Sequence, residues 1–267
     1  MALDPRTRIA SVTLRVTDPD RVLSLYRDAL AIDLDEHPLI RLTADSDAEA
    51  PPPRAAGLFH TAIRFPTRES LAEVLVRVAR AGFELTGASD HGVSEALYLD
   101  DPEGNGVELY WDRPADSWPR HLDGTVAMYT LPLDVRKLAR EAGDGKVAPP
   151  ETDIGHVHLK TTDIPAMVKF WEKGMGMELQ ALLGNQAAFL SLAGYHHHIG
   201  ANTWRSHGGE PLPQGALGLE RITLEVPDAR SLKRGLSGAK KLKAELVGEA
   251  TVLAPDGIPV ELVTASA

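Results

Sequence analysis

The sequence contains no cysteine, which excludes disulfide bonds and thiolate metal ligands. This absence fits a reducing compartment, and the first residues, MALDPRTRIASV, lack the apolar stretch of a secretory signal. We therefore expect a cytoplasmic location. No apolar run approaches the roughly 18 residues that a membrane helix needs, so a membrane partner is not expected.

Basic side chains are also in short supply. The chain has 28 lysines and arginines against 38 aspartates and glutamates, a formal net charge of −10. Nucleic-acid binding depends largely on basic side chains that meet phosphates, so a nucleic-acid partner is not expected. Aromatic residues make up only 5%, and four tryptophans are too few to indicate an aromatic substrate cage. The remaining class is small-molecule chemistry that uses His, Asp, Glu and Arg, in a chain long enough for two domains.

One pattern occurs four times along the chain. An alternating apolar segment predicts a half-buried strand, a short polar residue follows, and an amphipathic segment then predicts a helix. The polar residue is suited to cap the helix, because its side-chain oxygen can accept from the free amides of the first turn. The four strands begin near Ile9, Leu58, Ile154 and Leu219, and the four caps are Asp18, Thr67, Asp163 and Asp228.

More strand-like runs follow each helix, separated by turn signals such as DPEGN and APDG. The repeat is therefore strand–helix–strand–strand–strand, and the fold class is α+β with four βαβββ modules. We predict two domains of two paired modules each, residues 1–113 and 154–267. A linker over 114–153, rich in proline and charge, should carry a short helix near 134–142.

The segments GHVHLKTTD, DPEGNGVELYWD and GYHHHIGANTW resemble the vicinal oxygen chelate superfamily, also called the glyoxalase/bleomycin resistance/extradiol dioxygenase superfamily. Two of these stretches are similar to the two-domain group that contains the catechol 2,3-dioxygenases of bacilli. The resemblance covers nearly the whole chain. It implies a cupped, glyoxalase-like sheet in each domain and a divalent metal in one or both cups. It also implies that the ligands come from the first and last strands of paired modules.

Candidate ligands follow from aligning the four caps. Counting back seven residues gives the positions Ser11, His60, His156 and Arg221 on the first strands. The last strands offer Glu108, Glu261 and one of the three histidines 196–198. The first cup then holds His60 and Glu108 beside a weak Ser11, and the second holds two imidazoles and one carboxylate. That second inventory is the one that binds non-haem Fe(II) and leaves positions open for substrate and oxygen.

We therefore predict a metal site of His156, His198 and Glu261, with His60 and Glu108 as a second candidate site. Strand alternation separates His197 from its two neighbours, and His197 remains the fallback ligand if the register shifts by one residue. Fe(II) is the expected metal, with Mn, Zn or Ni as alternatives.

A competing assignment comes from the family. Its type I extradiol enzymes take both histidine ligands from first strands and use a last-strand histidine as an acid/base. Arg221 occupies the position of the second such ligand here, and a guanidinium cannot ligate a cation. We assign His197 and Arg221 as catalytic, one moving a proton and the other stabilising negative charge on oxygen.

Substrate contacts are expected from His158, Trp204 and His91. Each candidate histidine also has a structural interpretation, as a strand or loop residue that is satisfied by hydrogen bonds.

The resemblance implies an extradiol ring-cleaving dioxygenase that acts on a catecholic small molecule with O₂. Two alternatives stay open: a glyoxalase-type isomerase or lyase, and a binding protein without turnover. A homodimer is possible, because exposed edges of cupped sheets commonly pair.

Overall fold

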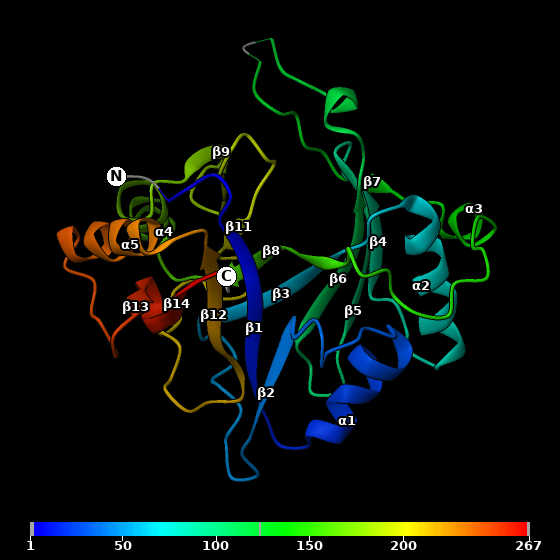
Figure 1. Cartoon of the computed structure of the whole chain (residues 1–267), viewed down its shortest axis with the longest axis horizontal. Coiled ribbons are helices and arrows are strands. Elements are labelled where there is room, and N and C mark those ends of the chain that lie inside the picture. The colour runs from blue at the N-terminus through cyan, green and yellow to red at the C-terminus, as the bar shows by residue number, and fades with distance from the viewer. Residues whose placement is uncertain (1–2, 123, 266–267) are drawn as a thin grey trace. The chain divides into compact units, whose positions relative to one another are not determined.

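The second and third of the four repeats have the full strand–helix–strand–strand–strand order (Figure 1). The structure is a computed structural model, and it describes residues 3–122 and 124–265. The second repeat comprises β3 (Gly57–Arg64), α2 (Arg68–Arg80), β4 (Gly87–Asp90), β5 (Ser94–Asp100) and β6 (Gly106–Asp112). The third comprises β8 (Asp153–Lys160), α4 (Ile164–Lys169), a π-helical turn (Phe170–Gly174), β9 (Glu178–Leu183), β10 (Ala187–Ser191) and β11 (Ile199–Asn202).

The first and fourth repeats are shorter in the described part of the chain. The first has β1 (Arg8–Val16), α1 (Pro19–Leu23), a π-helical turn (Ser24–Ala29) and β2 (Ile40–Ala44). The fourth has β12 (Gly218–Val226), α5 (Ala229–Lys241), β13 (Thr251–Ala254), a 3₁₀ turn (Pro255–Gly257) and β14 (Ile258–Thr264). Between the second and third repeats lie a 3₁₀ turn (Ala115–Ser117), β7 (Leu131–Pro132) and α3 (Val135–Ala139). The last is the short helix that the sequence predicts near 134–142.

The four predicted helix caps are confirmed. In every repeat the side-chain oxygen of the cap accepts a hydrogen bond from the backbone amide three residues later. The pairs are Asp18 with Arg21, Thr67 with Ser70, Asp163 with Ala166, and Asp228 with Ser231. At α2 the bond is reciprocal, because the Ser70 hydroxyl also accepts from the Thr67 amide at 3.1 Å. Short polar side chains therefore fix where each strand ends and each helix starts.

Two compact units divide the chain, and neither is one continuous stretch. The first contains the described residues of 1–17, 41–59 and 156–267, and the second contains 18–40 and 60–155. They do not coincide with the predicted segments 1–113 and 154–267, because β1 and residues 41–59 group with the C-terminal repeats. The predicted linker 114–153 lies within the second unit.

The same strand pairing recurs inside the repeats. The first strand runs parallel to the last in three of them: β3 with β6, β8 with β11, and β12 with β14. In the first unit, β1 pairs antiparallel with β12, so the first and fourth repeats share a sheet. In the second unit, the strand order is β3-β6-β5-β4-β7. The helix α2 buries Leu71, Val74 and Val78 and packs against β6.

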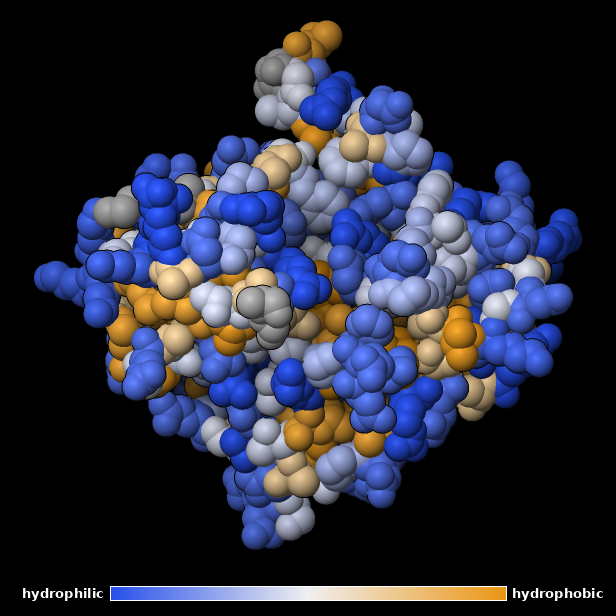
Figure 2. Space-filling view, viewed as in Figure 1, coloured by the Kyte–Doolittle hydropathy of each residue, from blue (hydrophilic) through white to orange (hydrophobic). Residues whose placement is uncertain are grey.

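Hydrophilic residues cover most of the molecular face shown in Figure 2, and apolar residues reach it in separate small areas. In the part of the chain that the structure describes, no helix has the length and apolar character needed to cross a membrane.

Candidate metal centre

His60 and Glu108 meet on one face of the sheet of the second unit. In the parallel pair β3–β6, Ala62 lies opposite Glu108. Side chains alternate between the two faces of a strand, so His60 shares its face with Ala62 and therefore with Glu108. Nε2 of His60 lies 2.9 Å from Oε2 of Glu108, and the two side chains are 7% and 4% exposed. The pair predicted as the second candidate site is thus a buried imidazole–carboxylate contact.

Tyr98 supports Glu108 from the neighbouring strand. It lies opposite Glu108 in the antiparallel pair β5–β6, and its hydroxyl hydrogen-bonds to the carboxylate. Burial, and then the negative charge of Glu108, raises the pKa of the Tyr98 hydroxyl well above its usual value. The hydroxyl therefore keeps its proton at neutral pH and can donate it to a hydrogen bond.

His91 lies on the far side of Tyr98. Its Nε2 is 2.7 Å from the Tyr98 hydroxyl, and its Nδ1 is 2.8 Å from the backbone carbonyl oxygen of Tyr129. A carbonyl only accepts, so the Nδ1 position carries a proton that it donates to Tyr129. The sequence predicts a substrate contact for His91. In this structure its ring contacts the Tyr98 hydroxyl and orients it.

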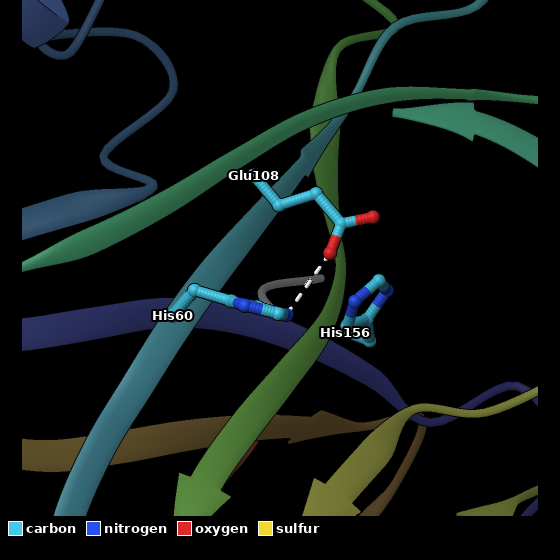
Figure 3. Close-up of side chains that lie close together, drawn as sticks. All are labelled: His60, Glu108 and His156. Atoms are coloured by element: carbon cyan, nitrogen blue, oxygen red, sulfur yellow. Dashed lines mark ion pairs between the residues drawn. The ribbon is translucent and has the colours of Figure 1, made fainter. Parts of the chain in front are cut away.

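His156 lies near the start of β8, whose first residue, Asp153, is bound by an arginine of β3. The guanidinium of Arg64, at the end of β3, donates two hydrogen bonds to Asp153, at 3.0 and 2.7 Å. His156 follows Asp153 three residues later. The possible ligand atoms of His60, Glu108 and His156 all lie within 4.8 Å of one another, and all three residues are buried (Figure 3).

This donor set fits a divalent transition metal. Two ligands bound to one ion at about 2.1 Å and at right angles lie about 3.0 Å apart. The observed distance from Nε2 of His60 to Oε2 of Glu108, 2.9 Å, matches that spacing. Two imidazoles and one carboxylate are also the ligand types that hold non-haem Fe(II) with open positions. The inventory is the one predicted from the sequence, but it draws on the second and third repeats.

Gly200 occupies the position in the third repeat that Glu108 occupies in the second. His156 and His60 are equivalent by their distance to the helix caps, so His158 is equivalent to Ala62. His158 lies opposite Gly200 in the pair β8–β11, as Ala62 lies opposite Glu108. A Cβ atom at Gly200 would come within 2.8 Å of the His158 ring. The third repeat therefore adds one imidazole to the group and no second carboxylate.

The three adjacent histidines lie in the loop before β11, which starts only at Ile199. The prediction that residues 196–198 form a strand with alternating faces is therefore wrong. The chain turns just before them, where Ala193 and Gly194 have φ angles of 55° and 69°. These left-handed conformations end the preceding strand, and only glycine adopts them at no steric cost.

The loop places two of these histidines beside His156. The rings of His197 and His156 are 4.1 Å apart, centre to centre, and Nδ1 of His197 is 2.9 Å from Nδ1 of His196. Nδ1 of His198 instead accepts a hydrogen bond from the Leu192 amide at 3.1 Å. In this geometry His197 is a neighbour of the candidate metal ligand, and His198 holds the loop in place.

The remaining predicted ligands pair with each other in the fourth repeat. Glu261 lies opposite Thr223, the register that Glu108 has in the second repeat. Its Oε2 accepts from the Thr223 hydroxyl at 3.2 Å and lies 3.3 Å from Nε of Arg221. In the fourth repeat Arg221 thus neutralises Glu261. At the equivalent positions of the second repeat, His60 contacts Glu108. Among the described residues, the group of possible metal ligands consists of His60, Glu108 and His156, and it includes neither His198 nor Glu261.

Tyr98 is not among the site residues predicted from the sequence, although the sequence carries a signal for it. The turn DPEGN connects β5 to β6, and residues equally far from the centre of a hairpin turn face each other. Tyr98 and Glu108 stand five residues on either side of Glu103, the centre of this turn. The turn alone would therefore have placed a tyrosine across from the candidate carboxylate.

Comparison with known proteins shows the family. Residues 8–109 match the model of the Glyoxalase/Bleomycin resistance protein/Dioxygenase superfamily. A known relative is 37% identical to this chain over 222 residues, which cover 82% of this chain and 75% of the relative. The chain belongs to this superfamily, as the sequence motifs indicate.

That relative is the catechol-2,3-dioxygenase of Bacillus subtilis (strain 168). The biphenyl-2,3-diol 1,2-dioxygenase 2 of Rhodococcus globerulus is 36% identical over 83 residues, 31% of this chain and 44% of that protein. Among solved structures, glyoxalase I from Zea mays superposes with a TM-score of 0.58 at 16% identity, covering 97% of this chain and 92% of that one. This likeness confirms the glyoxalase-like fold.

Proposed function

We propose that the chain is a metal-dependent extradiol ring-cleaving dioxygenase that acts on a catecholic compound with O₂. The observation that carries the proposal is the buried group of His60, Glu108 and His156, whose ligand atoms lie within 4.8 Å of one another. The similarity to a catechol-2,3-dioxygenase supports the choice of reaction within the superfamily.

In this proposal His60, His156 and Glu108 hold Fe(II), with Mn(II) as the alternative. One carboxylate and two neutral imidazoles leave a bound ion with residual positive charge, which favours a chelating catecholate and leaves room for O₂. The pair Tyr98 and His91 keeps the Glu108 carboxylate oriented, since Tyr98 donates to it and His91 contacts the same hydroxyl. Burial of the group excludes water from its polar atoms.

His197 is proposed as the residue that moves a proton. It is 8% exposed, and its ring lies 4.1 Å from that of His156. An imidazole in this position can accept the proton of a substrate hydroxyl beside the metal and later return it. Arg221 has no part in this proposal, because its guanidinium pairs with Glu261.

A glyoxalase-type isomerase is the less favoured reading of the same fold. The family resemblance implies that such an enzyme needs a four-residue His/Gln/Glu set, drawn from the first and last strands of paired repeats. Gly200 stands at the last-strand position in the third repeat, where the His158 ring fills the space next to it. The described residues thus offer three ligands and open positions, which suits a chelating substrate and oxygen.

The test combines metal content with product analysis. The full chain is reconstituted with Fe(II) without oxygen, beside His60→Ala, Glu108→Ala and His156→Ala, with Glu261→Ala as the matched control. We expect about one equivalent of iron in the wild type and in the control, and a loss in the other three variants. With catechol under ¹⁸O₂, the product should be a ring-opened acid that contains both labelled atoms.

Three outcomes would contradict the proposal. Loss of iron in Glu261→Ala, with retention in His60→Ala, would move the site to the fourth repeat. Iron binding without oxygen uptake would exclude the dioxygenase and favour the isomerase class. If the wild type holds no metal at all, a binding protein without turnover becomes the better explanation.

A further inference from the structure

An aromatic cluster in the first unit extends from His156 towards solvent. It consists of five residues, Phe59, His158, Phe189, His197 and Trp204, which we call the aromatic cluster. Their rings meet edge to face or tilted. The centre-to-centre distances are 5.0 Å from His197 to Phe189, 5.7 Å from Phe189 to His158, 5.8 Å from His158 to Trp204 and 5.6 Å from Trp204 to Phe59.

The two ends of the aromatic cluster differ in exposure. His197 is buried and lies against the candidate metal ligand His156, with ring centres 4.1 Å apart. Trp204 is 49% exposed. A flat aromatic ligand held at His156 can therefore rest on ring faces and edges, which attract another aromatic ring beyond the area it buries.

Two cations stand at the exposed end of the cluster. Lys160 and Asn202 are opposite each other at the ends of the parallel strands β8 and β11. Trp204 and Arg205 follow Asn202 after one intervening residue, Thr203. The Arg205 guanidinium lies 5.6 Å from the centre of the Phe59 ring, so it belongs to the same surface.

These cations have no acidic partner among the described residues: Arg205 contacts an aromatic ring, and Lys160 is influenced electrostatically by Arg205. Burial, and then the charge of Arg205, lowers the pKa of the half-buried Lys160 ammonium. Such an arrangement costs free energy, because a partly desolvated charge without a counter-ion is unfavourable. A bound anion would relieve this cost.

Strand geometry relates the cations to the metal group. His156, His158 and Lys160 alternate with their neighbours along β8 and therefore point to one face of the strand. At about 3.3 Å per residue, the Cα atoms of His156 and Lys160 lie about 13 Å apart. The long lysine side chain can reach back over part of that distance.

We propose that the preferred substrate is a catechol that carries a carboxylate on a short chain, on the side of the ring away from its two hydroxyls. This inference rests on the proposed function. The ring lies along the aromatic cluster, and the carboxylate binds Lys160 and Arg205 through charge-assisted hydrogen bonds. The two cations then select substrates by charge, while the metal group recognises the hydroxyls.

Two catechols of equal chain length test this selection: 3-(3,4-dihydroxyphenyl)propionate, which is an anion, and 4-propylcatechol, which is neutral. Their dissociation constants are measured by calorimetry without oxygen on the Fe(II)-loaded full chain. We expect the anion to bind about tenfold or more tightly than the neutral compound. Lys160→Met and Arg205→Met should each bring the ratio of the two constants towards one. The matched control Lys233→Met, an exposed lysine of α5, should keep the wild-type ratio.

Oxygen uptake with 4-propylcatechol is measured in parallel, because it reports on the proposed function alone. Uptake together with a wild-type ratio near one would overturn the anion site and leave the dioxygenase standing. A ratio that persists in Lys160→Met and in Arg205→Met would also overturn it. A selective wild type without oxygen uptake would support the anion site and refute the dioxygenase. If neither catechol binds, both proposals fail.

Discussion

Replacing Tyr98 with phenylalanine removes a single hydroxyl between Glu108 and His91 and leaves the buried ring in place. Glu108 then loses a neutral donor that orients its carboxylate. A hydrogen bond to a charged group contributes about 1.5–3 kcal/mol, and each 1.4 kcal/mol is about a factor of ten in an equilibrium constant. We therefore expect Tyr98→Phe to bind a divalent metal roughly 10- to 100-fold more weakly than the wild type, in line with the usual effect of losing a group that orients a ligand.

The assay is a competition titration of the metal-free chain with Zn(II) against a fluorescent chelator. Tyr129→Phe is the matched control, because His91 binds the backbone carbonyl of Tyr129 and this bond survives the substitution. The control should bind metal like the wild type. Unchanged affinity in Tyr98→Phe would refute the reasoning, as would an equal loss in Tyr129→Phe.

Three further substitutions test other parts of the structure. Gly200→Ala places a Cβ atom 2.8 Å from the His158 ring, so we expect a loss of about 1–3 kcal/mol, measured by urea unfolding; unchanged stability would contradict the tight packing. Thr67→Ala removes the cap of α2 and should cost about 1 kcal/mol in the same assay, whereas no loss would mean that the cap is not needed. Burial raises the pKa of Asp101 above 3.8. The stability of the wild type relative to Asp101→Asn should therefore be greatest below pH 3.8 and fall as pH rises through the folded pKa, a trend that an NMR titration midpoint at or below 3.8 would exclude.

Local signals in the sequence predict the repeats well. Each cap binds the amide three residues later within its own helix, so nothing distant is needed to place it. Counting back from the caps then identifies His60 and His156, and the last strand of the second repeat identifies Glu108. These are the three residues that the structure gathers. The ligand types and their positions within a repeat are thus readable from the sequence.

The combination of repeats is not readable in the same way. The predicted metal site combines His156 with Glu261, which requires that repeats adjacent in the chain pair with each other. In the structure β1 pairs with β12, and Glu261 faces Arg221. Which repeat lies beside which depends on packing between distant segments, and no local pattern encodes it.

The loop of the three histidines shows a second limit. Alternation along a strand can separate His197 from His198 only if both lie in that strand, but β11 starts after both. The positive φ angle at Ala193 decides this, and an alanine gives no sequence signal for such a conformation. The position of Gly200 is hidden in the sequence for a similar reason. Its equivalence to Glu108 becomes visible only once the pairing of β8 with β11 is known.

The most direct test of the metal group is anomalous diffraction at the iron edge from crystals of the Fe(II)-loaded chain. The proposed function predicts one strong peak within about 2.3 Å of an imidazole nitrogen of His60, an imidazole nitrogen of His156 and a carboxylate oxygen of Glu108. A peak beside Glu261 or His198, or no peak in a crystal shown to contain iron, would contradict it.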